Sequence, residues 1–332
     1  MRAPALFRRL VVAVLVIVFV ADVWPDAHRE LFSSISFTYD PDKGNLTHVR
    51  TGDACSRSSI LSKLVLLSSF SHPDILPPYK SVRYANWIAP LYGLAFCGVP
   101  KSMSTLLYAA FCFLNYPTRF MSANKTISTE FWNKSLCDND LNERNSYDDA
   151  MKAIGKNATI LSIIRHPLDR FLSGYLYICH YDDTFDENER CFGCKGNLSC
   201  FVEKIHRSLI TFDKEQEPES AAERRAIYHF APQTWFCDFE HHRNDFEIIH
   251  YKPGPDGAEK MAVQLDEVLA NAKVPIAYRR TIHQEVLKGT TPHSTFMSPL
   301  RKKVAKQLCS DPTLVKRFLQ MYFHDYVELG FL

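Results

Sequence analysis

A lysine and two hydroxyl residues follow a short apolar run in the stretch Leu94–Leu114, LAFCGVPKSMSTLLYAAFCFL. The run Leu94–Cys97 predicts a strand, and the later apolar residues recur at helical spacing. Lys101, Ser104 and Thr105 fall in or just after the turn between the two. A strand, a tight turn with a lysine and the start of a helix together suit an anion, because N–H groups and the helix dipole point at it. The stretch therefore predicts a phosphate site around Lys101.

This turn differs from the phosphate loop of Mg-dependent NTPases, GxxxxGK[ST]. Lys101 comes three residues before Ser104, no second glycine precedes it, and no metal-binding aspartate follows a strand. The order P-K-x-x-S-T resembles instead the 5′-phosphosulfate loop of sulfotransferases that use 3′-phosphoadenosine 5′-phosphosulfate (PAPS). An ordinary turn between a strand and a helix is the alternative interpretation of so short a match.

A second strand–turn–helix unit follows at Ala158–Arg165, ATILSIIR, where Pro167 fits the first turn of a helix. The segment IIRHPLDRFLSGY resembles the 3′-phosphate-binding motif of the same family, R-x-P-x-x-R-x-x-S-x-Y. The resemblance implies that Arg165 and Ser173 hold the 3′-phosphate, and a guanidinium fork with a hydroxyl suits a dianion. A surface arginine is the alternative for Arg165. Two such units predict an α/β domain whose mostly parallel central sheet is flanked by helices.

Four later segments resemble Golgi carbohydrate sulfotransferases of the chondroitin 4-sulfotransferase and HNK-1 sulfotransferase group: HFAPQTWFCDF, DFEIIHY, PHSTF and LVKRFLQMYFHDYVELGF. The similarity spans Leu94–Leu332 and fits best the nematode chondroitin 4-O-sulfotransferase-like branch. It implies a P-loop-like sulfotransferase fold that moves a sulfuryl group from PAPS to a sugar hydroxyl of chondroitin or a related glycosaminoglycan. Two departures stand out: Ser102-Met103 replaces a small Cys-Gly or Ala-Gly pair, and KPGP follows FEIIHY where the group often has an acidic residue.

The resemblance also implies roles for individual side chains. Lys101 would contact the 5′-phosphate and the bridging oxygen and so stabilise the leaving group. The expected donor site consists of Pro100, Lys101, Ser102, Met103, Ser104, Thr105, Arg165 and Ser173. A histidine suits the general base that accepts the sugar proton, and His229 in HFAPQ is the first choice, with Glu130 and His293 as alternatives. A structural histidine bonded to a backbone carbonyl is the other interpretation of His229. No metal is expected, since lysine, arginine and amides can meet the charges of the donor.

Two other function classes stay open. A P-loop kinase would bind a related phosphate, although the second glycine and the metal-binding aspartate are missing. A secreted glycoprotein could keep the fold as a glycan-binding module without catalysis. The formal net charge of +2 gives no sign of a nucleic-acid partner, so any anion site must be local.

The N-terminus predicts entry into the secretory pathway. Arg2, Arg8 and Arg9 precede the apolar run Leu10–Ala21, so residues 1–24 are expected to form a cytoplasmic tail and signal-anchor, with a cleaved signal peptide as the alternative. Residues 25–54 are expected to form a lumenal stem, and residues 55–332 the PAPS-dependent domain. The expected location is the Golgi membrane, as a single-pass type II protein, or the secreted fraction.

Sequons and cysteines agree with a lumenal, oxidising compartment. The five sequons begin at Asn45, Asn124, Asn133, Asn157 and Asn197. The ten cysteines are an even number and predict disulfides. In the dense segment from Cys179 to Cys200, disulfides are favoured over zinc, because only Cys191 and Cys194 have the spacing of a ligand pair. The basic run Arg301–Lys303 is interpreted as a solvated helix face, with docking of an anionic glycan as the alternative.

Overall fold

The computed structural model describes residues 55, 60, 63, 74–130, 135–137, 142–155, 158–288, 291 and 294–331. The chain divides into the units Met1–Gly52 and Asp53–Leu332, and all these residues belong to the second. The predicted tail, anchor and stem lie outside the described residues, as do the sequon asparagines Asn45, Asn133 and Asn157. Within the described ranges, no helix has the length and apolar character needed to span a bilayer.

Within the part of the chain that the structure describes, five strands form one mixed sheet in the order β3-β1-β2-β4-β5. The strands are β1 (Asn86–Ala89), β2 (Leu94–Cys97), β3 (Glu143–Arg144), β4 (Thr159–Arg165) and β5 (Phe246–Tyr251). Strands β2, β4 and β5 are parallel, whereas β1 runs antiparallel to both β2 and β3. The prediction of a mostly parallel sheet was therefore wrong. Only the turn Pro90–Tyr92 and Gly93, with φ +61°, separate β1 from β2, and a connection this short permits only an antiparallel pair.

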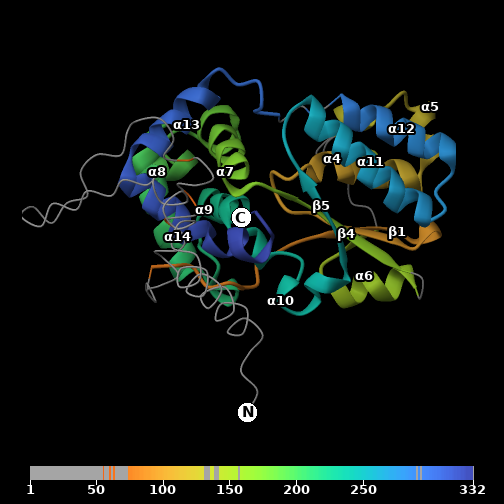
Figure 1. Cartoon of the computed structure of the whole chain (residues 1–332), viewed down its shortest axis with the longest axis horizontal. Coiled ribbons are helices and arrows are strands. Elements are labelled where there is room, and N and C mark those ends of the chain that lie inside the picture. Colours follow the sequence, from red (N-terminus) through yellow and green to blue (C-terminus); the bar gives the residue numbers. More distant parts are fainter. Residues whose placement is uncertain are drawn as a thin grey trace, which may run out of the picture. The chain divides into compact units, whose positions relative to one another are not determined.

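Alternation along the strands gives the sheet two buried faces. Leu94 and Phe96 of β2 belong to one apolar core, and Ala95 and Cys97 belong to the other. The helices on the two faces are α4 (Ser104–Asn115), α5 (Pro117–Ser122), α6 (Tyr147–Ile154), α11 (Pro255–Asn271) and α12 (Ile276–Leu287). Helices α4, α11 and α12 cover the first face, and α6 covers the second (Figure 1).

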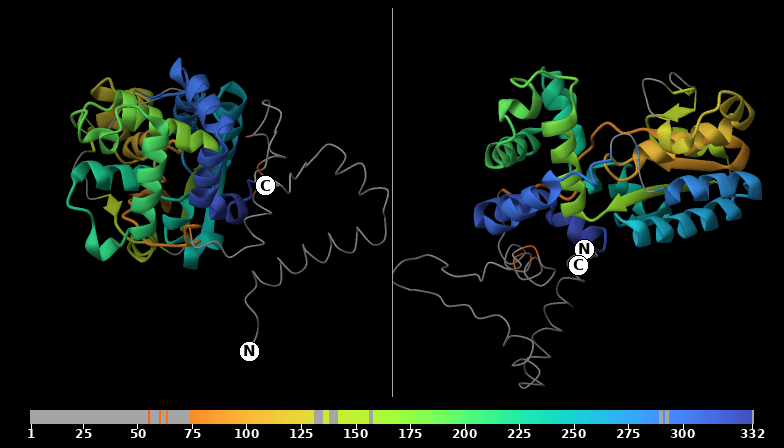
Figure 2. Two further views of the ribbon diagram at one scale, coloured as in Figure 1. Left: turned by 90° about the vertical axis from the view of Figure 1, so that its left-hand side faces the viewer. Right: turned by 90° about the horizontal axis from the view of Figure 1, so that it is seen from above.

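A second group of helices packs together beyond the ends of β2 and β4, and the right-hand view of Figure 2 shows it to one side of the sheet. It consists of α7 (Pro167–Leu176), α8 (Leu198–Thr211), α9 (Ala221–Phe230), α13 (Leu300–Ser310) and α14 (Pro312–Glu328), with the short α10 (Phe239–His242) nearby. Phe171 of α7 forms edge contacts with Phe230 and Phe318 in the centre of this group. Asp311 caps α14 ahead of Pro312, and its side chain accepts hydrogen bonds from the N–H groups of Thr313 and Leu314.

Five disulfides use all ten cysteines, which confirms the prediction of disulfides. The pairs are Cys55–Cys309, Cys97–Cys237, Cys112–Cys137, Cys179–Cys191 and Cys194–Cys200. The four cysteines of the dense segment pair with one another, so their sulfurs are bonded rather than held as thiolates for zinc.

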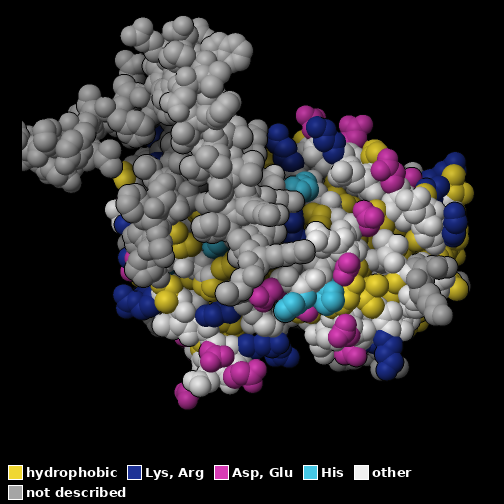
Figure 3. Space-filling model, turned by 60° about the horizontal axis from the view of Figure 1, so that its bottom comes forward, with side chains coloured by type: hydrophobic (Ala, Val, Ile, Leu, Met, Phe, Trp, Pro, Cys, Tyr) yellow, Lys and Arg dark blue, Asp and Glu magenta, His cyan; other side chains and the backbone are white. Residues whose placement is uncertain are grey.

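Charges of both signs share the surface. Figure 3 shows lysine and arginine side chains interspersed with aspartate and glutamate over the described part of one face. This mixture agrees with the small net charge. A continuous basic face, the electrostatic footprint of a nucleic-acid binder, does not occupy the side shown.

Candidate active site

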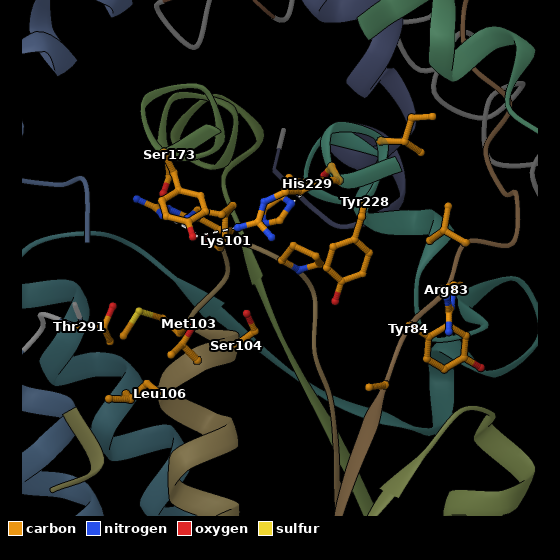
Figure 4. A pocket seen from close by; sticks show the side chains of 18 of the residues that line it. Arg83, Tyr84, Lys101, Met103, Ser104, Leu106, Ser173, Tyr228, His229 and Thr291 are labelled. Carbon is orange, nitrogen blue, oxygen red and sulfur yellow. Dashed lines mark hydrogen bonds between the residues drawn. The ribbon is translucent and has the colours of Figure 1, made fainter. Parts of the chain in front are cut away.

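Both predicted phosphate motifs open onto one cavity of about 580 Å³. Its wall includes seven of the eight expected donor residues: Pro100, Lys101, Met103, Ser104, Thr105, Arg165 and Ser173. In Figure 4, Met103 lies on one side of the cavity and Arg83 lies on the opposite side. The volume falls within the range of pockets that hold small molecules. Because β2 and β4 are parallel neighbours, the loops after them emerge at the same edge of the sheet, and this brings the two motifs together.

The loop after β2 has a strained backbone. Lys101 and Met103 take φ values of +64° and +60°, a left-handed region that costs a residue other than glycine roughly 1–2 kcal/mol. Helix α4 begins at Ser104, and no side-chain cap bonds its first turn. The N–H groups of that turn are therefore available to an anion at the positive end of the helix dipole.

Ser102 is the expected donor residue that does not line the cavity. Its side chain is fully buried, and its hydroxyl donates to Gln233 Oε1 at 3.3 Å. The loop turns this side chain toward the protein interior while Lys101 and Met103 face the cavity. Any contact of Ser102 with a ligand is thus left to its backbone.

Arg165 ends β4 with a buried guanidinium on the cavity wall. Its Nη1 donates to the carbonyl of Lys101 at 3.0 Å, which joins the two motifs directly. Burial lowers the pKa of Arg165 to about 10, so the side chain stays charged at neutral pH. Its Nε is buried and has no hydrogen-bond partner among the described residues. An anion in the cavity would satisfy this donor, since a buried unpaired donor is costly.

Ser173 belongs to α7 and lines the same cavity as Arg165. It is buried, and its hydroxyl accepts a hydrogen bond from Thr295 Oγ1 at 3.2 Å. Thr295 also lines the cavity and belongs to the PHSTF segment. The structure therefore adds a second hydroxyl beside the predicted one.

Lys101 lies among positive charges. Burial and the nearby guanidinium groups of Arg165 and Arg225 lower the pKa of Lys101 to about 7. Its Nζ lies 3.9 Å from the centroid of the Tyr177 ring. A site that gathers one lysine and several arginines around one cavity suits a multiply charged anion.

His229 lies in the last turn of α9 and lines the cavity. Its Nδ1 lies 2.8 Å from the carbonyl oxygen of Arg225, and because a carbonyl only accepts, Nδ1 carries the proton and Nε2 is the basic nitrogen. Burial and the Lys101 charge lower the pKa of His229 to about 3, which keeps the ring neutral at pH near 7. The hydrogen bond from Nδ1 to the Arg225 carbonyl is the backbone contact expected of a structural histidine. This bond leaves Nε2 unprotonated, so the same histidine could still accept a proton.

The other two predicted bases differ in position. Glu130 is buried away from the cavity, where its carboxylate accepts from the N–H of Leu136 at 2.6 Å and pairs with Lys125 at 3.0 Å. These contacts give it a structural role in the loop after α5. His293 lies outside the described residues.

Arg170 is a residue that the sequence analysis left without a role, although it occupies the second arginine position of the 3′-phosphate motif. Its buried guanidinium donates to three carbonyls, those of Pro100 at 2.9 Å, Ala231 at 2.8 Å and His229 at 3.3 Å. It therefore ties the first loop to the segment that carries His229. Arg170 is the second arginine of the motif R-x-P-x-x-R. The motif alone does not show which of its two arginines faces a ligand and which holds the protein together.

Within the described part of the chain, no cluster of three or more His, Cys, Asp or Glu side chains has a geometry that could hold a metal ion. Three arginines, Arg165, Arg170 and Arg225, lie near Lys101 together with the carboxylate of Asp182. Such a wall suits an anionic ligand, because guanidinium and ammonium groups form strong hydrogen bonds to phosphate oxygens.

A cavity lined by the two predicted phosphate motifs, on a mixed α/β sheet, agrees with the comparison to known families. The family described as "Sulfotransferase family" matches residues 85–331, so the chain belongs to the sulfotransferase family. Among curated proteins, it is 27% identical over 277 residues to carbohydrate sulfotransferase chst-1 of Caenorhabditis elegans, covering 82% of each chain. It is 32% identical over 216 residues to vep-2 of the same organism, covering 64% of this chain and 65% of the relative. No solved structure gives a significant match.

Proposed function

We propose that this sulfotransferase moves the sulfuryl group of PAPS to a hydroxyl of a sugar, and that the sugar belongs to chondroitin or a related glycosaminoglycan. The observation that carries the donor assignment is the buried Arg165 Nε, which lacks a partner among the described residues and lies on a wall shared with Lys101 and the start of α4. Arg165 and Ser173 would hold the 3′-phosphate. Lys101, Ser104, Thr105 and the amides of the first turn of α4 would hold the 5′-phosphate.

The proposed reaction exchanges one S–O bond for another. The sugar oxygen forms a bond to sulfur while the bond from sulfur to the bridging oxygen breaks, and 3′-phosphoadenosine 5′-phosphate (PAP) leaves. Lys101 stabilises the charge that develops on the bridging oxygen. His229 Nε2 takes the hydroxyl proton as general base. Binding of the anionic donor offsets the Lys101 charge, one of the causes that lower the pKa of His229, so the histidine becomes a stronger base when the donor is present.

The acceptor assignment rests on the other part of the cavity. Arg83, Tyr84 and Arg224 line it together with the aromatic Tyr228. In Figure 4, Arg83 and Tyr84 lie across the cavity from Met103 and Thr291. Guanidinium groups bind carboxylates and aromatic rings pack against sugar faces, so this side suits an acidic polysaccharide. The relative chst-1 is named a carbohydrate sulfotransferase, which supports a sugar acceptor.

We further propose a lumenal site of action in the Golgi, with the N-terminal segment as a type II anchor. Five disulfides among the described cysteines support an oxidising compartment. The sequon asparagines Asn124 and Asn197 are exposed, as an N-glycan requires.

Incubation of the full chain, expressed through a secretory host, with radiolabelled PAPS and a panel of desulfated glycosaminoglycans tests the proposal. Label should appear on chondroitin, and disaccharide analysis should place it at the 4-hydroxyl. Lys101→Ala should abolish transfer, whereas Lys306→Ala, at an exposed lysine on α13, should not. Glycan binding without any transfer would favour the binding module, and thermal stabilisation by ATP–Mg but not by PAP would favour the kinase.

A further inference from the structure

Tyr177 contacts Lys101 but belongs to neither phosphate motif. It is the first residue of a π-helical turn, Tyr177–Tyr181, that continues α7 beyond Leu176. Its ring lies under the Lys101 ammonium, with Nζ 3.9 Å from the ring centroid, and both side chains line the cavity. Single π-helical turns inside helices frequently occur at functional sites. The widened turn places the Tyr177 ring at the loop that carries Lys101.

The ring is held in place by a chain of polar contacts. Arg225 Nη2 donates to the Tyr177 hydroxyl at 3.1 Å, and Arg225 Nε pairs with Asp182 Oδ2 at 2.6 Å. The buried Asp182 also accepts the N–H of Thr184 at 3.1 Å. The disulfide Cys179–Cys191 fastens the same turn to the segment after it. Tyr177 is thus a fixed surface rather than a freely rotating side chain.

The surroundings of Lys101 explain why such a surface matters. The charged and titratable groups around it come from the end of β4, from α7, from the turn after α7 and from α9, and they are Arg165, Arg170, Tyr177, Asp182, Arg225 and His229. Three of them are arginines, and with burial they disfavour the ammonium form. The face of an aromatic ring attracts a cation, most strongly where water is displaced. Among these groups, only Asp182 and the Tyr177 ring favour the charged lysine.

We propose that Tyr177 is a positioning residue for Lys101: its ring holds the ammonium at the sulfuryl-transfer site and keeps it charged among three arginines. The consequence for catalysis rests on the proposed function, in which Lys101 stabilises the leaving oxygen only as a cation. The contact itself does not depend on that function.

The protonation of Lys101 can be followed without any enzyme assay. Competitive acetylation of the full chain by acetic anhydride, with mass-spectrometric readout of Lys101, gives its reactivity as a function of pH. Tyr177→Leu removes the ring and should favour the neutral form of Lys101. At about pH 6 the rate of Lys101 acetylation, divided by its rate at high pH where the lysine is fully deprotonated, should therefore rise about fivefold. Tyr177→Phe keeps the ring and should restore the wild-type pH dependence. Tyr181→Leu, at the far end of the same turn, is the matched control.

Kinetics supply the second readout. If transfer from PAPS is established, the alkaline limb of kcat/KM for PAPS should move to lower pH in Tyr177→Leu but not in Tyr177→Phe. An unchanged or upward-shifted Lys101 titration in Tyr177→Leu overturns the inference, whether or not sulfate is transferred. A shifted titration in a chain that transfers no sulfate keeps the inference and removes the proposed function. Tyr177→Met, which also lacks a ring, replaces Tyr177→Leu if thermal melting shows that the leucine variant is unfolded.

Discussion

Gln233 pairs with both main-chain groups of Arg165. Its Nε2 donates to the Arg165 carbonyl at 2.8 Å, and its Oε1 accepts from the Arg165 N–H at 2.9 Å. The same amide accepts from the Ser102 hydroxyl at 3.3 Å and donates to Asp325 Oδ2 at 3.3 Å. Gln233, Ser102 and Asp325 are all fully buried. One side chain therefore connects the end of β4, the loop after β2 and helix α14, and it fixes the distance between the two proposed phosphate sites.

Replacing Gln233 by alanine should damage both stability and donor binding. The change leaves the Arg165 main chain and the Asp325 carboxylate buried without these partners, and each unsatisfied group costs about 1–3 kcal/mol. We expect the free energy of unfolding to fall by at least about 2 kcal/mol and the affinity for PAP to fall with it. Chemical denaturation and calorimetric titration with PAP measure the two effects.

Gln307→Ala, an exposed glutamine on α13, is the control for this experiment. Gln233→Glu separates the two ends of the amide, because it keeps the acceptor for Arg165 and Ser102 and loses the donor. A Gln233→Ala protein with wild-type unfolding and wild-type PAP affinity would show that the amide has no organising role.

The sequence assigned Lys101 and Arg165 to one expected donor site, because each follows a β-type run and precedes a helix. In a sheet where those strands are parallel neighbours, such loops must meet, and the structure joins them through a hydrogen bond from Arg165 to the Lys101 carbonyl. The roles of these residues toward PAPS stay predictions. The sequence could not show that Glu130 makes only structural contacts, because a glutamate in a structural loop and a glutamate in an active site look alike in a sequence.

Other features depend on long-range contacts that leave no local pattern. Strand β1, NWIA, is buried at every position and so lacks the alternation that marks a strand. The partner of Cys97 could not be deduced from spacing, because ten cysteines allow many pairings. His229 lies in the last turn of α9, a helix that begins after the capping serine Ser220 in a charged stretch. These elements form because of tertiary packing rather than local preference.

His229→Gln tests the general base. Glutamine can keep the hydrogen bond to the Arg225 carbonyl but cannot take a proton, so we expect kcat to fall by about 100-fold or more. The affinity for PAP should stay close to the wild-type value, because the lost function is proton transfer. Radiolabel transfer at saturating PAPS measures the first, and calorimetry the second. A loss of PAP binding equal to the loss of rate would indicate a role in donor binding instead.

Because His229 is buried in its neutral form, the free energy of unfolding should fall in mild acid. Its pKa falls from 6.5 to about 3 on folding, so between these values the unfolded chain binds a proton that the folded chain does not. The free energy of unfolding is therefore highest above pH 6.5, the His229 pKa in the unfolded chain, and it falls as the pH drops toward about 3, the pKa in the folded chain. At pH near 5 the loss is about 2 kcal/mol. Chemical denaturation at pH near 7 and near 5 measures the free energy of unfolding, and the drop between the two pH values should be smaller for His229→Gln than for the wild type. Equal losses would contradict a buried neutral histidine.

Met103→Gly should stabilise the protein. Met103 has φ +60° immediately before α4, and glycine adopts this conformation without the steric cost of a Cβ. We expect the free energy of unfolding to rise by up to about 1 kcal/mol, since the greater entropy of an unfolded glycine offsets part of the relief. Thr105→Gly, two residues later within the helix, should instead lower it. A destabilised Met103→Gly would mean that the side-chain contacts of the methionine outweigh its backbone strain.

The disulfide Cys97–Cys237 should matter to donor binding as well as to stability. Cys97 ends β2 directly before the proposed 5′-phosphate loop, and Cys237 follows the segment that carries Gln233. Its partners are 140 residues apart, whereas Cys194 and Cys200 are separated by 6. Loop-closure entropy then predicts a loss of about 5 kcal/mol for Cys97→Ala/Cys237→Ala and about 2 kcal/mol for Cys194→Ala/Cys200→Ala. Under conditions where both double variants are folded, only Cys97→Ala/Cys237→Ala should also weaken PAP binding. The reason is that only the Cys97–Cys237 disulfide is attached to the strand that leads directly into the proposed 5′-phosphate loop. Equal PAP affinities in the two double variants would show that the packing around β2 holds the loop without the disulfide.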